Sequence, residues 1–167
     1  SHGSILSRLP AACQKVDKPS AALVKDLKQR GLFDSTVVHW GGEMGRLPVV
    51  QNDAGRNKIG RDHNTHGFSM WVAGGGFKAG NVHGTTDEWG HKAVEDVVNH
   101  YDYHATLLHL FGLDHQELIF RRSNQDQTLT DGQPGTVIEA LLVDACGPWK
   151  KLPSIVVFPC SRCQEKV

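Results

Sequence analysis

The sequence predicts one α/β layered domain, on three observations. The chain has 167 residues, which suits a single compact domain with a sizeable core. Segments whose apolar residues recur at helical spacing alternate with short β-branched runs, in the order helix, strand, loop, strand, loop, helix. The 18 Gly and 10 His are typical of a polar site built from loops rather than of a helical bundle.

Two helical segments are expected at the start of the chain. Apolar residues recur at helical spacing over residues 5–16, where Pro10 interrupts the pattern. A second helix is expected to begin at Pro19 and to end at Gly31. Proline favours the first position of a helix, and glycine favours the position just after its last turn.

Two buried strands and two long loops are expected next. Residues 35–40 and 68–73 are β-branched or aromatic runs that end at glycines. Residues 41–65 and 78–95 are polar and have no periodicity. Loops of this length in a compact domain are usually functional or disordered.

A third helix is expected over residues 103–111, with Asp102 as its N-cap and Gly112 as its end. This start leaves His100 outside the helix. Two short elements are expected further on, a strand and a small helix: residues 118–120 and 135–142.

Composition excludes two classes of protein. Lys and Arg number 18, Asp and Glu also number 18, and the pI is near 7.1, so a generally basic nucleic-acid binder is excluded. No apolar run approaches the roughly 20 residues that span a bilayer. Cys160 and Cys163 form a single Cys-x-x-Cys pair. A structural zinc site needs a second such pair, or histidines at the matching spacing, and the sequence has neither.

Acidic, imidazole and guanidinium side chains follow the first strand and precede the second. Glu43, Asp62 and His63 are residue types that ligate divalent metals. Arg46 and Arg61 lie beside them and suit a phosphate or sulfate group. Each segment also has a structural interpretation, in which Glu43 pairs with Arg46 across a tight turn and Asp62 caps its own loop.

Other candidates carry less information. His66 and Asp87 are further candidates for lining the site, although exposed loop acids are usually only solvated. His39 lies inside a predicted strand and is expected to be packed or paired. His2, taken alone, does not indicate a function.

Four stretches follow one another in the chain: GLFDSTVVHWGGEMGRLPVVQN, GRDHNTHGFSMWVAGGGFKAGNVHGTTDEWGHKAVEDVV, HYDYHATLLHLFGLDHQELIF and LTDGQPG. In this order they resemble domain-of-unknown-function family 1501 (DUF1501), a sulfatase-like branch of the alkaline phosphatase superfamily. The resemblance covers residues 1–142. It implies the C-terminal half of a three-layer α/β sandwich. Residues 143–167 do not resemble the family and are expected to be a poorly ordered tail.

The resemblance also implies a chemistry. Members of the superfamily hydrolyse phosphate or sulfate esters at a site with one or two divalent metals, zinc or calcium above all. His2 matches the end of an Asp-x-His-Gly element, and His63 matches a late metal histidine. Glu43 matches the ligand element that follows the first strand, where members of the superfamily usually have Asp-His. Asp62 is an additional ligand candidate. Arg46 and Arg61 are then expected to bind the oxygens of a sulfate or phosphate ester.

No residue of this chain matches the family's nucleophile, so no catalytic residue is assigned in it. We expect the C-terminal part of a metal-dependent ester hydrolase that is itself inactive, from a parent protein exported from the cytoplasm. The alternative is a non-catalytic binding protein with the same fold, for a sulfated polysaccharide or a surface partner. A sheet without its neighbouring strands is expected to expose an edge at residues 37–38 or 70–71 and to aggregate, with residues 41–66 and 78–95 mobile.

Overall fold

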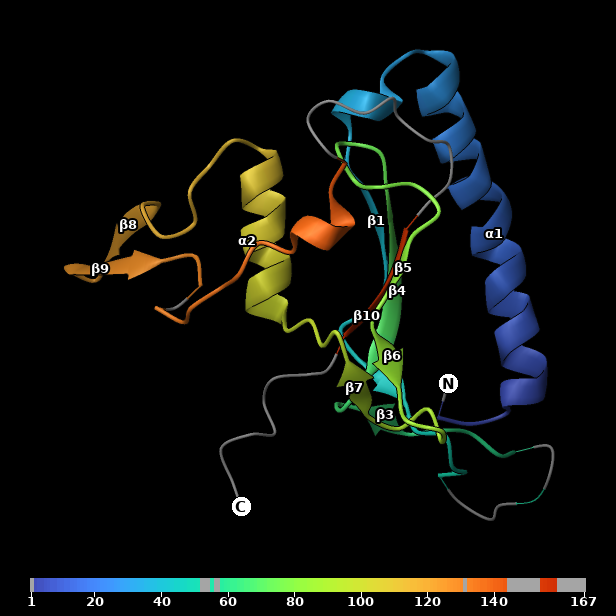
Figure 1. Cartoon of the computed structure of the whole chain (residues 1–167). Helices are drawn as coiled ribbons and strands as arrows, with labels where there is room; N and C mark the ends of the chain where they lie inside the picture. Colours follow the sequence, from blue (N-terminus) through green and yellow to red (C-terminus); the bar gives the residue numbers. More distant parts are fainter. Residues whose placement is uncertain (1, 52–54, 56–57, 131, 144–153, 159–167) are drawn as a thin grey trace.

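The computed structural model describes residues 2–51, 55, 58–130, 132–143 and 154–158. Two helices, α1 (Ile5–Gln29) and α2 (His100–Leu110), lie on opposite sides of a central sheet (Figure 1). The chain therefore has the mixed α/β content that the sequence predicts. In the described part of the chain, neither helix is long and apolar enough to cross a membrane. The Cys160–Cys163 pair lies outside the described residues.

The central sheet has four strands in the order β1-β4-β10-β5. These are β1 (Val38–Trp40), β4 (Phe68–Ala73), β10 (Ser154–Phe158) and β5 (Val82–His83). Strand β4 pairs antiparallel with both β1 and β10, whereas β10 and β5 are parallel. The open edge expected in this region therefore lies at β1 and not at β4, which has a neighbour on each side.

The two buried strands that the sequence predicts differ in how well their predicted bounds match the structure. Strand β4 has the predicted bounds. Strand β1 starts three residues later than predicted, because residues Phe33–Ser35 form a 3₁₀ turn (η1) before it. Strand β10 belongs to the tail that follows residue 142.

Three two-stranded hairpins complete the strands. They are β2 (Gly45–Arg46) with β3 (His63–Asn64), β6 (Thr85–Thr86) with β7 (Ala93–Glu95), and β8 (Ile119–Arg122) with β9 (Gln125–Thr128). The first two lie within or beside the segments expected as loops. The strand expected at residues 118–120 is part of β8.

The hydrophobic core lies between the sheet and α2. Its buried members include Met70 and Val72 of β4, Tyr103 of α2 and Leu141 of the short 3₁₀ turn η2 (Glu139–Leu141). This turn is all that forms of the small helix expected at residues 135–142. No residue of α1 is itself buried, and none belongs to the main core cluster.

Helix α1 corrects the prediction of two segments, because one helix runs through both Pro10 and Pro19. An interior proline removes one hydrogen bond and costs about 3 kcal/mol. Spacings of three and four residues nevertheless continue across both prolines, in the series Leu6, Leu9, Cys13, Val16, Ser20, Leu23 and Leu27. The helix ends before Gly31, whose φ of 69° is the predicted terminating conformation.

Helix α2 corrects the predicted N-cap. Asn99 is the N-cap, and its side chain accepts a hydrogen bond from the Asp102 backbone N–H at 2.9 Å. The Asp102 carboxylate accepts in return from the Asn99 backbone N–H at 3.2 Å, which completes a capping box. His100 therefore lies on the helix and not outside it. Gly112, with φ of 75°, follows its end as predicted.

Candidate metal centre

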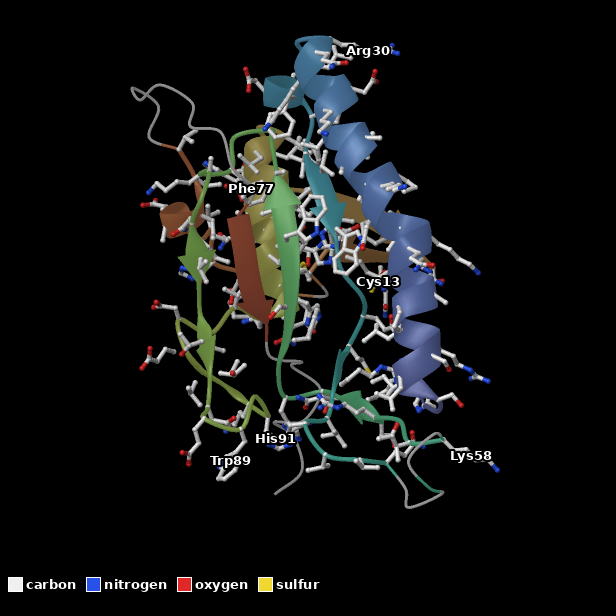
Figure 2. All side chains as sticks on the ribbon, turned by 90° about the vertical axis from the view of Figure 1, so that its right-hand side faces the viewer. Cys13, Arg30, Lys58, Phe77, Trp89 and His91 are labelled. Atoms are coloured by element: carbon white, nitrogen blue, oxygen red, sulfur yellow. The ribbon has the colours of Figure 1, made fainter. Side chains whose placement is uncertain are left out.

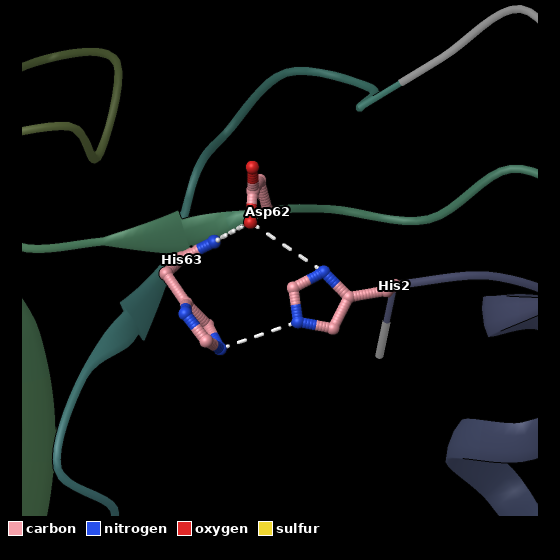
Figure 3. A group of neighbouring side chains, drawn as sticks. All are labelled: His2, Asp62 and His63. Atoms are coloured by element: carbon pink, nitrogen blue, oxygen red, sulfur yellow. Dashed lines mark hydrogen bonds and ion pairs between the residues drawn. The ribbon is translucent and has the colours of Figure 1, made fainter.

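Three of the predicted ligands come together. His2, Asp62 and His63 place one ligand atom each within 4.8 Å of one another (Figure 3). No other group of three acidic, histidine or cysteine side chains in the described ranges does so. The cluster joins the start of the chain to β3, 61 residues further along.

Backbone pairing positions His2. The backbone N–H groups of Ser4 and Ile5 donate to the carbonyls of Lys58 and Ile59, at 3.2 and 3.0 Å. At the next residue, Gly60, a Cβ would collide with the backbone of His2. Only glycine therefore lets the two segments approach this closely. Figure 2 places Lys58 and His91 at one end of the molecule and Arg30 at the other.

The β2–β3 hairpin positions Arg46. Arg46 and His63 are directly opposite partners in this antiparallel pair, so their side chains share a face. The Arg46 Nη1 atom reaches His2 Nε2 at 3.0 Å and the Arg61 carbonyl oxygen at 3.3 Å. A permanent positive charge therefore stands at the cluster.

The two edges of the His2 ring have different partners. Its Nδ1 lies 3.0 Å from Gln51 Oε1 and 3.4 Å from Asp62 Oδ1, whereas its Nε2 lies 3.2 Å from His63 Nε2. Because the Arg46 guanidinium can only donate, the Nε2 that it contacts carries a lone pair. In the neutral ring the proton is then on Nδ1, which faces the oxygens of Gln51 and Asp62.

This arrangement fits a transition metal. Two nitrogens bound to tetrahedral zinc at 2.0–2.1 Å are separated by about 3.3 Å, and the Nε2 atoms of His2 and His63 are 3.2 Å apart. Asp62 lies at the far edge of the His2 ring (Figure 3). A carboxylate in that position holds a metal-binding histidine through its other N–H group.

The cluster is open to solvent. The side chains of His2 and Asp62 are 48% and 51% exposed. Their own ion pair therefore adds little stability. Arg46 is exposed as well, so its guanidinium can meet an anion from solvent.

The other predicted ligands lie outside the cluster. Glu43 is exposed in the bend before β2. Arg61 contributes its backbone carbonyl to Arg46. Neither side chain belongs to the group that His2, Asp62 and His63 form.

His66 belongs to a second histidine pair, with its ring centroid 5.0 Å from that of His91. Buried Asn64 ties their segments together. Its side chain accepts from the His66 backbone N–H at 3.0 Å and donates to the His91 carbonyl at 2.7 Å. The pair is thus fixed by a structural asparagine.

Asp87 closes the turn between β6 and β7. Its carboxylate accepts from the backbone N–H groups of His91 at 2.8 Å and Lys92 at 3.1 Å. These donors, His91 first, lower the pKa of Asp87. The geometry gives this residue a structural role in the turn.

His39 is paired, as the sequence predicts for a histidine within a strand. Its Nδ1 forms a hydrogen bond with the hydroxyl of Tyr103, which is buried in α2. Burial lowers the pKa of His39, and the nearby charge of His104 lowers it further. Burial raises the pKa of Tyr103.

Sequence reasoning missed two residues of the site, Gln51 and Gly60. Both lie in the polar segment 41–65, which has no periodicity. Gln51 is recognisable only from its contact with His2, and Gly60 only from its close approach to the same residue.

A separate groove of about 610 Å³ lies between α1 and the sheet. Trp40 and Trp71 form part of its lining. They are direct partners across β1 and β4, with ring planes within 6° of parallel and centroids 6.4 Å apart. Lys25 and Lys28 of α1 also line the groove.

A family model described as "Protein of unknown function (DUF1501)" matches residues 1–142 of the chain. No curated protein and no solved structure shows significant similarity to it.

Proposed function

The chain belongs to the DUF1501 family, and on that premise we propose that it carries the metal- and oxyanion-binding part of a hydrolase of sulfate or phosphate esters. The observation that carries the proposal is the cluster of His2, Asp62 and His63 with the Arg46 guanidinium at its edge. Helices on both sides of the sheet support a sulfatase-like sandwich of the alkaline phosphatase superfamily (Figure 1). Export from the cytoplasm remains a prediction from the resemblance.

In this proposal each residue has a distinct task. His2 and His63 hold the metal through their Nε2 atoms, and Asp62 fixes the ring of His2 from the opposite edge. Two imidazole ligands favour zinc over calcium, which prefers oxygen ligands. The metal would supply Lewis-acid polarisation of an ester oxygen. Arg46 binds the oxygens of the sulfate or phosphate group.

Zinc binding tests the proposal. We expect competition with a coloured chelator to show one zinc site in the wild-type chain. His2→Gln and His63→Gln remove ligands and should abolish that site. Asp62→Asn removes a supporting group and should weaken zinc binding about 10- to 100-fold.

The matched control is His109→Gln, which changes an exposed histidine of α2 outside the cluster. It should leave zinc affinity unchanged. Zinc binding that survives both His2→Gln and His63→Gln would overturn the assignment. Circular dichroism of each variant separates loss of the site from loss of the fold.

The second candidate function is non-catalytic binding of a sulfated polysaccharide, and the groove beside α1 favours it. The stacked tryptophan rings offer apolar surface, and the two lysines of the lining, which outnumber its one acid, Asp17, offer positive charge to sulfate groups. With metal removed by a chelator, a sulfated polysaccharide should then bind to the chain more tightly than its unsulfated form. Trp71→Ala should remove that binding and leave zinc affinity intact. Equal or absent binding of both polysaccharides rejects this candidate.

A further inference from the structure

Arg46 contacts the same atom, His2 Nε2, that would bind a metal. His2 Nε2 has a single lone pair in the plane of the ring, and Arg46 Nη1 donates to it at 3.0 Å. The same Nε2 faces His63 Nε2 at the separation of two metal ligands. A metal bound by both imidazoles therefore displaces the guanidinium from His2.

We propose that Arg46 blocks the ligand nitrogen of His2 in the metal-free protein, and that metal and a tetrahedral oxyanion enter the site cooperatively. The inference rests on the proposed function, because it takes His2 and His63 as the metal ligands. It adds a coupling between two binding events, carried by one side chain.

The displaced guanidinium stays at the site. Its Nη1 also donates to the Arg61 carbonyl at 3.3 Å, and pairing of β2 with β3 keeps Arg46 opposite His63. Movement away from Nε2 thus needs only a side-chain rotation. Two positive charges, on the metal and on Arg46, are then held close together.

No carboxylate in the described part of the chain forms an ion pair with Arg46. The Asp62 carboxylate of the cluster lies at the Nδ1 edge of the His2 ring, away from the Nε2 edge that Arg46 contacts, so it offsets the repulsion between guanidinium and metal only in part. A sulfate or phosphate dianion resolves it, because its oxygens can accept from the guanidinium and face the metal at once. The chemistry of the site thus selects an oxyanion over a neutral ligand.

Thermodynamic linkage makes the coupling reciprocal, so the factor by which the oxyanion raises metal affinity equals the factor by which the metal raises oxyanion affinity. Couplings of this kind are typically about 5- to 150-fold. Since the site is half exposed and screened by salt, we expect about tenfold, near the lower end of that range.

The experiment measures zinc affinity by chelator competition, without sulfate and with saturating sulfate at constant ionic strength. Wild-type zinc affinity should rise about tenfold with sulfate. Arg46→Met removes the block and the anion contact together. Without sulfate it should bind zinc more tightly than wild type, and sulfate should change its affinity little. Arg122→Met, an exposed arginine of β8, is the matched control and should behave as wild type.

The outcomes separate the two proposals. If wild type binds zinc through His2 and His63 but Arg46→Met binds it equally or more weakly without sulfate, the inference is overturned and the metal site stands. If sulfate raises the zinc affinity of Arg46→Met as much as that of wild type, the coupling does not pass through Arg46. If wild type binds no zinc, the proposed function fails and the inference with it.

Discussion

His39 and Tyr103 connect β1 to α2 through a hydrogen bond between imidazole and hydroxyl. Burial is the larger cause of the lowered pKa of His39, and the charge of His104 is the smaller. The folded protein therefore keeps this ring neutral at a pH where the unfolded chain, with a pKa of about 6.5, takes up a proton. The stability that neutral His39 contributes is therefore complete above a pH of about 6.5. It declines as the pH falls toward the lower pKa that His39 has in the folded protein.

We predict that the NMR titration of His39 gives a pKa below the ordinary histidine value, and that His104→Gln raises it. In urea unfolding, the stability of wild type should fall between pH 7 and pH 5 by more than that of His39→Gln, which keeps a polar partner for Tyr103 but does not titrate. A His39 pKa at or above the ordinary value contradicts the assigned burial effect.

Gly60 sets the position of His2, because a Cβ at residue 60 would collide with the His2 backbone. Gly60→Ala should push the segment that begins at His2 away from its neighbour and lower zinc affinity about 10- to 100-fold, as loss of a supporting group does. Gly42→Ala is the matched control, because a Cβ there has only ordinary contacts and its φ is not positive. Equal affinities for the two variants would show that His2 does not need this close approach.

The candidate ligands were predictable to unequal degrees. Asp62 and His63 are adjacent in sequence and identify themselves as metal-binding residue types. His2 gains meaning only from the family resemblance, since its place depends on backbone pairing with residues 58–59. Glu43 has the right chemistry after a predicted strand, yet it lies outside the cluster. Spacing along the chain does not reveal which loop residues meet.

Asp102 both caps the start of α2 and binds a distant segment of the chain. Besides its bond to the Asn99 backbone, its carboxylate accepts from the Thr136 backbone N–H at 2.9 Å. One turn later, Thr106 Oγ1 accepts from the Ile138 backbone N–H at 3.0 Å. The helix therefore holds the segment that leads to buried Leu141.

We predict that Asn99→Ala lowers the free energy of unfolding by about 1 kcal/mol, as expected for the loss of an N-cap. Asp102→Ala should cost about 2 kcal/mol, because it removes a capping bond and a tertiary bond. Urea denaturation measures both. Asp126→Ala, which changes an exposed acid of β9, should be close to neutral. A smaller loss for Asp102→Ala than for Asn99→Ala would show that the bond to Thr136 adds nothing.

Elements were predictable where a pattern is long and uninterrupted. Strand β4 has six residues bounded by glycine and was placed without error. Helix α1 was divided because local rules assign prolines to helix starts, whereas its apolar spacing continues through them. Two-residue strands such as β2 and β3 have no period to detect, although they position Arg46 and His63.

At the scale of the whole molecule, the alternation of helices and strands indicates a layered α/β fold, but it does not give the strand order. Strand β10 comes from outside the region that matches the family and lies between β4 and β5. The main core cluster lies on the α2 side of the sheet, whereas buried Val38 and Ala73 share the α1-facing side with Trp40 and Trp71. The α1 side carries the groove and a helix with no buried residue.

We predict that the 167-residue chain binds zinc without hydrolysing aryl sulfate or aryl phosphate. Its proposed ligands hold a metal and an oxyanion, whereas no serine or threonine in it matches the family's nucleophile. Turnover should stay at the blank level with added zinc, calcium or magnesium. Metal-dependent turnover that His63→Gln abolishes would place a complete catalytic site within this chain.

Helix α1 exposes apolar side chains to solvent, and we predict that the chain associates through them. Leu6, Leu9 and Leu23 are 59%, 51% and 51% exposed, and Trp40 at the edge strand is 47% exposed. Several exposed apolar side chains on one element favour association in water. Sedimentation velocity should therefore show an average mass that rises with protein concentration.

The double variant Leu9→Lys and Leu23→Lys should reduce this rise, because burying the new charges in a contact is costly. Leu129→Lys, at a site of similar exposure (53%) after β9, should leave the association unchanged. A wild-type chain that stays monomeric at every concentration would contradict this prediction.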